Sequence, residues 1–308
     1  MKAEKASDSA TIGLRESLSH GYIETPFFSG RRTQVAKGAD CKSVIHRFDS
    51  GRRLHFSCIF WYKEVDMKNQ IDQSFVNSFK ANGFVVLKGI QDSAQIAKLA
   101  VEVDRVHSEF DMHKKLHTDL IKLGEWCIKN PQLVSSDINN FFFSEIFRET
   151  CLGLVGNDVD FYWATTANKP PSKGRAFPWH QDSGYGKGPL DYLTCWVALD
   201  DVDEENGCLW AIPGSHKLDI FPHEFRKSSD TDYGGVFLKD APLDIERAIP
   251  IRLKAGQIAC FHSKLIHETR ENRSLRRRRG LISAYAATSA IVGHSLGPNE
   301  LPQILVRS

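Results

Sequence analysis

The sequence predicts an α+β chain with a mainly β core, in which antiparallel strands form a barrel or a double sheet. Two observations lead to this prediction. Segments with helical periodicity are concentrated before Asp160, and short β-rich runs divided by turn residues follow it. Helices followed by many short strands are typical of such α+β proteins. The 308 residues are 41% hydrophobic and 25% charged, which suffices for a sizeable core.

The first 70 residues carry no clear periodic pattern. They are rich in Gly, Ser and basic residues and contain one apolar patch, Phe56–Tyr62. We expect residues 1–70 to be an N-terminal extension, partly disordered or packed on the core. Residues 71–308 are expected to form a single domain.

A helical pattern begins near Asp72. Phe75, Val76 and Phe79 recur at helical spacing, and the sequence Ala81-Asn82-Gly83 ends the pattern. The elements expected next are a strand over 84–87 and helices over 93–110, roughly 112–128 and roughly 142–155.

Short strands dominate the chain after Asp160. They are expected over residues 161–167, 192–199, 208–212, 249–253, 257–266 and 280–287. Turn signals divide these runs, among them Pro170-Pro171, Asn206-Gly207 and Pro213-Gly214.

Charge and cysteine usage narrow the class of protein. The formal net charge is only +2, from 40 basic and 38 acidic residues, so neither nucleic acid nor an anionic membrane is an expected partner. No apolar run approaches the roughly 18 residues of a membrane-spanning helix, and the N-terminus lacks the apolar segment of a secretory signal. The 7 cysteines are scattered without a CxxC pair, which favours a reducing compartment. We therefore expect a cytoplasmic protein.

The segment Pro178-Trp179-His180-Gln181-Asp182 contains a candidate metal site. In a strand, residues two apart point to the same face, so His180 and Asp182 can bind one cation together. On its own this spacing is more simply explained by a turn histidine bonded to a neighbouring carboxylate, because short motifs give many false matches.

A second histidine strengthens the metal interpretation. His267 follows the expected strand over 257–266. Two histidines and one carboxylate form the facial triad that binds non-haem Fe(II) and leaves positions open for co-substrate and dioxygen. His262 is the rival ligand, but strand alternation puts it on the opposite face from His267.

Arg278 lies eleven residues after His267, at the head of the strand expected over 280–287. A planar guanidinium binds both oxygens of a carboxylate, as a 2-oxoglutarate site requires and an iron triad alone does not. Arg278 belongs to the run Arg276–Arg279, so a shift of one residue would give this role to Arg277 or Arg279. The run could also be a nucleic-acid patch, but the low net charge argues against this.

The region from Phe75 to Ala287 resembles the phytanoyl-CoA dioxygenase family. The matching stretches are Asn168-Lys169-Pro170-Pro171, Trp179-His180-Gln181-Asp182, Cys195-Trp196-Val197-Ala198-Leu199, Glu205-Asn206-Gly207-Cys208-Leu209, Ile212-Pro213-Gly214-Ser215-His216, His267 and Arg278. They cover about two thirds of the chain in the family's order.

The resemblance implies a double-stranded β-helix, the jelly-roll or cupin-like core, flanked by N-terminal helices. It implies a dioxygenase that uses Fe(2+), 2-oxoglutarate and O2, oxidises a small-molecule substrate, and releases succinate and CO2. His180, Asp182 and His267 would bind the iron. Arg278 would bind the far carboxylate of 2-oxoglutarate, with Trp196, Thr269 and Thr165 as further contacts.

The retained Asp182 bears on the type of reaction. In related iron halogenases a small residue replaces the carboxylate and opens a position for halide, so this chain is expected to hydroxylate or otherwise oxidise its substrate. Two other classes fit the fold: a non-catalytic metal-binding jelly-roll protein, and a metal-dependent isomerase or hydrolase. Neither of them requires a dicarboxylate anchor such as Arg278.

Overall fold

The computed structural model describes residues 71–117, 119–123, 126–185, 191–227, 234–240, 244–291 and 303–306. The expected N-terminal extension over residues 1–70 lies outside this range, and so does its apolar patch. The predicted boundary at residue 70 therefore stays a prediction.

Helix α1 (Gln73–Asn82) begins and ends where the sequence predicts. The side chain of Asp72 accepts a hydrogen bond from the backbone N–H of Phe75 at 2.8 Å and caps the first turn. Gly83 ends the helix with a φ of 82°, and its N–H donates to the carbonyl of Phe79. A Cβ at Gly83 would lie 2.4 Å from Nδ1 of His216, so the position requires glycine for both its conformation and its space.

The other helices lie mostly before the strands of the core. They are α2 (Ser93–Ser108), α3 (Phe110–Leu116), α4 (Ser136–Phe142), α5 (Glu145–Leu154) and α6 (Thr288–Ile291), with short 3-10 helices η2 (Pro131–Leu133), η3 (Asp182–Tyr185), η4 (Ser215–Lys217) and η5 (Ile245–Arg247). None of the described helices combines the length and apolar content that crossing a membrane requires.

The helix predicted over 112–128 is wrong in its second half. The chain instead forms the strands β2 (Ile121–Leu123) and β3 (Cys127–Lys129). In β3 the N–H of Ile128 donates to Oγ1 of Thr166 at 2.8 Å, and Lys129 pairs with Thr165. Pairing with a distant strand therefore overrides the local helical pattern.

The larger sheet contains eight strands in the described part of the chain, in the order β1-β11-β6-β13-β4-β3-β2, with β14 beside β4. Its other strands are β1 (Phe84–Leu87), β4 (Val159–Thr166), β6 (Leu193–Ala198), β11 (Ile258–His262), β13 (Gly280–Ala287) and β14 (Gln303–Val306). The pairings are antiparallel, and β13 has the predicted bounds.

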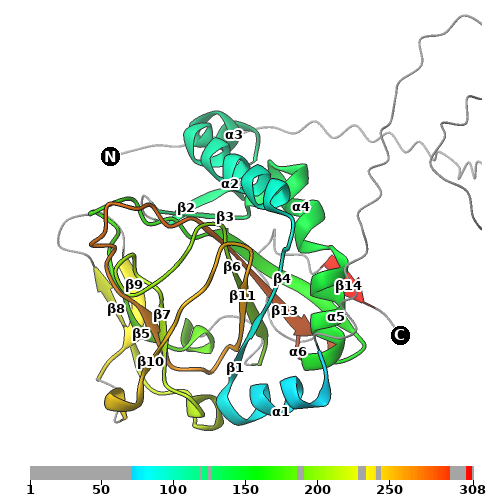
Figure 1. Ribbon diagram of the computed structural model, residues 1–308, viewed down its shortest axis with the longest axis vertical. Coiled ribbons are helices and arrows are strands. Elements are labelled where there is room, and N and C mark those ends of the chain that lie inside the picture. The colour runs from blue at the N-terminus through cyan, green and yellow to red at the C-terminus, as the bar shows by residue number, and fades with distance from the viewer. Residues whose placement is uncertain are drawn as a thin grey trace, which may run out of the picture. The chain divides into compact units, whose positions relative to one another are not determined.

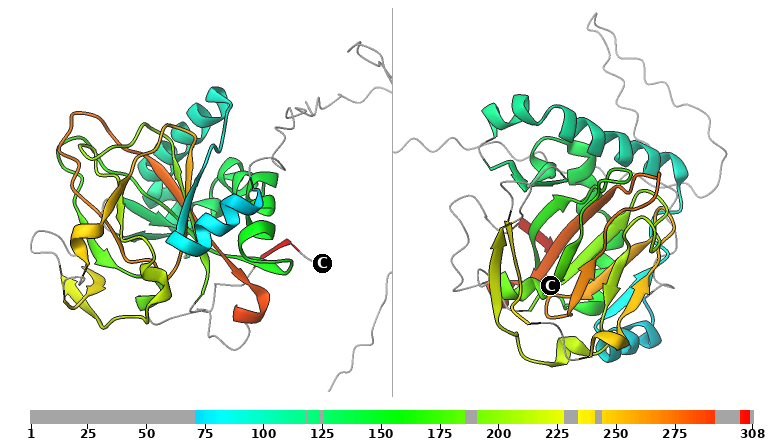
Figure 2. Two further views of the ribbon diagram at one scale, coloured as in Figure 1. Left: turned by 60° about the horizontal axis from the view of Figure 1, so that its bottom comes forward. Right: turned by 90° about the vertical axis from the view of Figure 1, so that its left-hand side faces the viewer.

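The smaller sheet faces the larger one (Figures 1 and 2). Its order is β10 (Ile249–Ile251), β7 (Leu209–Ala211), β12 (His267–Thr269) and β5 (Phe177–His180). A hairpin of β8 (His223–Lys227) and β9 (Gly234–Leu238) lies beside β5. Of the two predicted arrangements, the double sheet is confirmed, because the two sheets do not close into one barrel within the described residues.

The strand predicted over 257–266 is wrong as a single element. β11 ends at His262, the backbone turns, and β12 starts at His267 in the other sheet. The N–H of Leu265 donates to the carbonyl of His262 at 2.8 Å, and the N–H of Ile266 donates to Oγ of Ser215. This turn carries the chain from one sheet to the other and places His267 between them.

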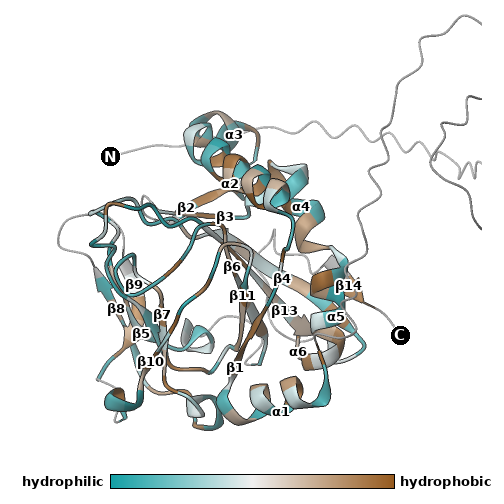
Figure 3. Cartoon of the chain, viewed as in Figure 1, coloured by the Kyte–Doolittle hydropathy of each residue, from teal (hydrophilic) through white to brown (hydrophobic). Residues whose placement is uncertain are grey.

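The two faces of the larger sheet bury different side chains. One face packs against α4 and α5, where the rings of Phe147 and Tyr285 stack 5.5 Å apart. The opposite face presents Trp196 and Phe261 to the smaller sheet. The helices carry both hydrophobic and hydrophilic residues, as expected for elements that cover one face of a sheet (Figure 3). The space between the sheets is where the candidate site residues meet.

Candidate metal and co-substrate site

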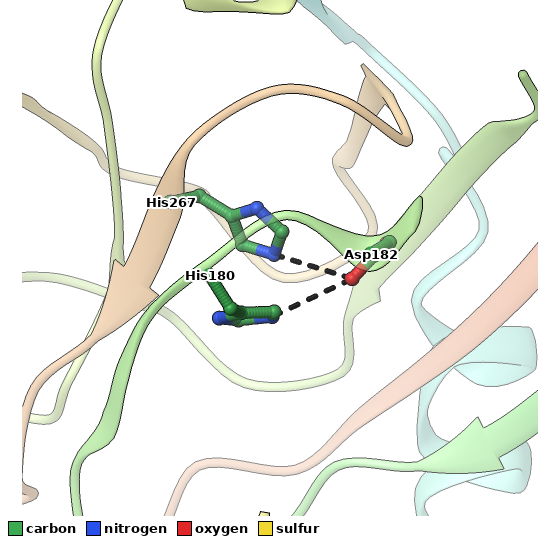
Figure 4. Close-up of side chains that lie close together, drawn as sticks. All are labelled: His180, Asp182 and His267. Atoms are coloured by element: carbon green, nitrogen blue, oxygen red, sulfur yellow. Dashed lines mark ion pairs between the residues drawn. The ribbon is translucent and has the colours of Figure 1, made fainter. Parts of the chain in front are cut away.

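His180, Asp182 and His267 come together between the two sheets (Figure 4). Nε2 of His180 lies 3.4 Å from Oδ1 of Asp182, and Nε2 of His267 lies 3.7 Å from the same oxygen. All three side chains are buried, and one ligand atom from each lies within 4.8 Å of the others. One cation can therefore contact the three residues at once.

The backbone explains the position of both histidines. His180 is the last residue of β5 and His267 the first of β12, and the two pair directly across the antiparallel ladder. Directly opposed residues project to the same face of a sheet. The two rings consequently lie with their centroids 4.1 Å apart.

Asp182 reaches the site by a different route from the one predicted. Strand alternation from His180 does not apply, because β5 ends at His180 and Asp182 begins the 3-10 helix η3. Its carboxylate is held from the larger sheet instead: the hydroxyl of Thr194 on β6 donates to Oδ2 of Asp182 at 2.8 Å. This leaves Oδ1 to face the histidines. Thr194 has no distinguishing signal in the sequence, since it is one polar residue within an apolar strand.

The hydrogen bonds of the histidines suit metal binding. Nδ1 of His180 lies 2.8 Å from the carbonyl of Pro178, and Nδ1 of His267 lies 2.8 Å from the carbonyl of Leu265. A carbonyl accepts a hydrogen bond, so both Nδ1 atoms carry the proton and both Nε2 lone pairs face Asp182. Two lone pairs and a carboxylate oxygen at this distance repel one another, and a divalent cation between them removes the repulsion. The residues present therefore fit Fe(II).

The pKa shifts agree with this arrangement. Burial lowers the pKa of His267 to about 4, which keeps its imidazole neutral near pH 7. Burial opposes ionisation of Asp182, but the pKa of this carboxyl is lowered all the same, and the hydrogen bond from Thr194 is one of the contacts that lower it. Neutral imidazoles and an ionised carboxylate are the forms that bind metal.

Arg278 is a buried cation on the larger sheet. It pairs with Lys169 in an isolated bridge just before β13 and is only 3% exposed. Its guanidinium donates to the carbonyls of Gly207 at 2.8 Å and Ala167 at 3.3 Å, and Nε has no hydrogen-bond partner among the residues that the structure describes. Burial lowers the pKa of Arg278 to about 10, so it remains charged near neutral pH. Among the described residues no carboxylate forms an ion pair with it, so the group is suited to bind the carboxylate of a ligand.

The neighbouring arginines of the run differ from Arg278 in this respect. Arg276 pairs with Asp203 at 2.6 Å, Arg277 with Asp104, and Arg279 with Asp200 at 2.6 Å. Each of these guanidinium groups already has a carboxylate within the chain. The geometry therefore favours Arg278 over Arg277 and Arg279 as the co-substrate anchor.

Trp196 and Thr165 lie in one row across the larger sheet, on either side of Ile282. Directly opposed residues share a face, so both project toward the smaller sheet. The guanidinium carbon of Arg278 lies 5.0 Å from the ring of Trp196, within cation–π range. Thr269 is half-buried at the end of β12, two residues after His267. The structure thus groups Trp196 with Arg278, while Thr165 donates to the carbonyl of Thr166.

His262 does not join the triad. Its ring lies 5.4 Å from the ring of His216 and 6.4 Å from that of Phe79, on the side of α1. The predicted reason, alternation along one strand with His267, is wrong, because the two histidines belong to different strands. The turn over 263–266 separates them.

The two facing antiparallel sheets and the buried His-Asp-His cluster define the chain as a non-haem oxygenase of the jelly-roll type. Residues 79–280 match the phytanoyl-CoA dioxygenase (PhyH) family, and the chain belongs to it. The predicted family, fold class and enzyme class, an Fe(II)- and 2-oxoglutarate-dependent dioxygenase, are confirmed.

Individual relatives are similar over most of the described domain. The chain is 28% identical to a probable alpha-ketoglutarate-dependent hypophosphite dioxygenase of Stutzerimonas stutzeri, over 67% of this chain and 71% of the relative. It is 25% identical to the peroxisomal phytanoyl-CoA dioxygenase of Rattus norvegicus, over 68% of this chain and 67% of the relative. The fold is similar to that of EctD from S. alaskensis with 2-oxoglutarate and 5-hydroxyectoine, with a TM-score of 0.59 and 18% identity over 77% of this chain and 84% of that structure.

Proposed function

We propose that this chain hydroxylates, or otherwise oxidises, a small organic molecule, with His180, Asp182 and His267 as the ligands of Fe(II). The observation that carries the proposal is the buried guanidinium of Arg278, which has no carboxylate partner among the described residues. It contacts Trp196, two residues along β6 from Thr194, which holds Asp182 of the buried His-Asp-His cluster. When bound, Fe(II) with 2-oxoglutarate and O2 supplies the oxidising chemistry, and 2-oxoglutarate leaves as succinate and CO2. The protein supplies orientation and keeps water out.

Each site residue has a distinct role in this proposal. The two imidazoles and the carboxylate would hold the iron, and the hydroxyl of Thr194 keeps Asp182 turned toward the histidines. Arg278 binds the far carboxylate of 2-oxoglutarate, with Trp196, Thr269 and Thr165 as neighbouring contacts. Asp182 would take the metal position that a halide needs, so the proposal favours oxygenation over halogenation.

Aromatic side chains border the triad on the side of His180. The ring of Phe177 meets the imidazole of His180 edge-on at 4.6 Å, and Phe237 of β9 packs against Phe177 at 5.0 Å. Tyr185 of η3 lies 6.1 Å from His180 and is 39% exposed. We infer that these rings line part of the substrate pocket. The two relatives named above differ in their named substrates, so the substrate does not follow from the family alone.

The expected location and partners belong to the same proposal. The described cysteines at positions 127, 151, 195, 208 and 260 are free thiols, which is compatible with a cytoplasmic protein. Three members of the arginine run are paired with carboxylates inside the chain, so the run offers little to nucleic acid.

A substrate screen scored by succinate release tests the proposed activity. Wild-type protein is loaded with Fe(II) under nitrogen and then given 2-oxoglutarate, O2 and candidate small molecules. We expect substrate-stimulated succinate in the wild type and none in His267→Ala. A metal-binding protein without catalysis would release no succinate with any candidate, and an isomerase or hydrolase would convert substrate without 2-oxoglutarate.

A further inference from the structure

Gln181, the residue between the proposed ligands His180 and Asp182, forms hydrogen bonds through both polar atoms of its side chain. Gln181 is completely buried. Its side-chain amide donates to the carbonyls of Lys264 at 2.9 Å and Asp219 at 3.3 Å, and its side-chain oxygen accepts from the N–H of Phe221 at 2.8 Å. The segment 219–223, which leads into β8, thus supplies two of the three hydrogen bonds of the Gln181 side chain.

The same segment also holds the backbone of Gln181. The N–H of Gln181 donates to Nε2 of His223 at 3.0 Å. Nδ1 of His223 lies 2.7 Å from the carbonyl of Phe221, so the proton is on Nδ1 and Nε2 is free to accept. This N–H belongs to the peptide unit that directly follows His180, and its orientation sets the direction from His180 to Asp182.

A second contact shows how closely His223 is fitted to this turn. A Cβ on Gly184 would lie 2.2 Å from the ring of His223, so the imidazole packs against the backbone of η3. The carbonyl of Gln181 meanwhile accepts from the N–H of Gly184 at 2.8 Å. Two contacts therefore hold the turn that presents Asp182. One is the hydrogen bond from Gly184 to Gln181 within the turn, and the other is the contact with His223.

We propose that His223 is a positioning residue for the metal site. It fixes the peptide unit between His180 and Asp182, so that the imidazole and the carboxylate stay directed at the same point. The hairpin of β8 and β9 is thereby tied to the metal ligands through both strands, since Phe237 on β9 lies 6.4 Å from the ring of His180. The inference rests on the proposed function, in which these ligands bind Fe(II).

The competing interpretation is that His223 only fills space. Two substitutions separate the alternatives. In His223→Gln the side-chain amide can place its oxygen near the position of Nε2 and accept the N–H of Gln181. In His223→Asn the amide is one methylene shorter and reaches only the position of Nδ1. Both variants are polar and lack the ring, so they match in everything except reach.

The test has one readout without metal and one with metal. The first is hydrogen exchange at the amide of Gln181 in the metal-free protein, where we expect protection to persist in His223→Gln and to fall in His223→Asn. The second is the Kd for Fe(II) under nitrogen. Partners of metal ligands typically contribute 10- to 100-fold to metal affinity, so we expect about a tenfold weaker Kd in His223→Asn and little change in His223→Gln.

The outcomes separate a failure of the proposed role of His223 from a failure of the proposed function. Wild-type protein that binds no Fe(II) contradicts the proposed function, and the exchange measurement then decides the role of His223 alone. Equal exchange or equal Kd values in the two variants would assign His223 to packing and overturn the proposal. Loss of folding in both variants would do the same.

Discussion

His180 and His267 are directly opposed on the antiparallel strands β5 and β12, and their rings lie 4.1 Å apart. The hydrogen-bonding ladder therefore fixes the two nitrogen donors of the proposed metal site, and the third proposed donor, Asp182, comes from a turn. A site with two donors on strands is more rigid than one built on loops, because strand backbones have less conformational freedom. The carboxylate then depends on neighbouring hydrogen bonds for its orientation.

Removing a triad histidine should abolish turnover while the fold survives. We expect His267→Ala to reduce succinate release by more than about 100-fold, because even partners outside the ligand set contribute 10- to 100-fold to metal affinity. Circular dichroism should be unchanged. His262→Ala is the matched control, since His262 packs against His216 on the other side of β11. Activity retained in His267→Ala and lost in His262→Ala would transfer the role to His262.

Truncating Arg278 should weaken the binding of 2-oxoglutarate far more than that of iron. Loss of one partner of a buried, charged hydrogen-bonded pair costs about 2–5 kcal/mol. The measurement is the Kd of 2-oxoglutarate in Arg278→Ala under nitrogen with Fe(II) present. Arg276→Ala is the control, because Arg276 is exposed and pairs with Asp203. A larger effect in Arg276→Ala or Arg279→Ala would mean that this other arginine, and not Arg278, binds 2-oxoglutarate.

The hydroxyl of Thr194 should influence iron affinity. Thr194→Val keeps the shape of the side chain but removes the hydrogen bond to Oδ2 of Asp182. We expect the Kd for Fe(II) to rise about 10- to 100-fold. Thr150→Val removes another buried hydroxyl, which bonds to the carbonyl of Ile146 within α5, and should leave the Kd unchanged. Equal Kd values in wild type and Thr194→Val would show that Asp182 needs no such support.

Acid should destabilise the fold partly through His107. Burial lowers the pKa of His107 from 6.5 to about 4, and its Nε2 lies 2.8 Å from Oγ1 of Thr166. Between these pH values the unfolded chain binds a proton that the folded chain does not, so the free energy of unfolding falls as the pH drops from about 6.5 to 4. Urea unfolding at pH 7.5 and 5 measures this loss. It should be smaller in His107→Gln, and an identical loss in both proteins would exclude His107 as a cause.

The sequence was most informative where local signals agree with the fold. Asp72 and Gly83 mark the ends of α1, and the apolar run over 280–287 is β13. The region 112–128 was misjudged because the pairing of β3 with β4 is not encoded locally. The single strand predicted over 257–266 is wrong because its turn contains only two polar residues, Ser263 and Lys264, and lacks the glycine or proline that usually marks a turn.

The candidate site, like the fold, could be predicted from the sequence only in part. The spacing of His180, Asp182 and His267 pointed to a common metal, but the reason given for Asp182 was wrong, since a 3-10 turn replaces strand alternation. Spacing alone left the arginine run ambiguous. Burial separates Arg278 from its paired neighbours, and burial is a property of the folded chain. Thr194 and His223 contact residues distant in sequence, and these contacts could not be predicted from the sequence.

The most direct measurement of the central claim is the absorption spectrum of the wild-type protein with Fe(II) and 2-oxoglutarate under nitrogen. The proposed site brings both to one metal, so a weak visible charge-transfer band should appear only when iron and 2-oxoglutarate are both present. The band should be missing in His267→Ala, and in Arg278→Ala it should require much more 2-oxoglutarate. A wild-type protein that is folded yet gives no band at saturating concentrations of both would contradict the account.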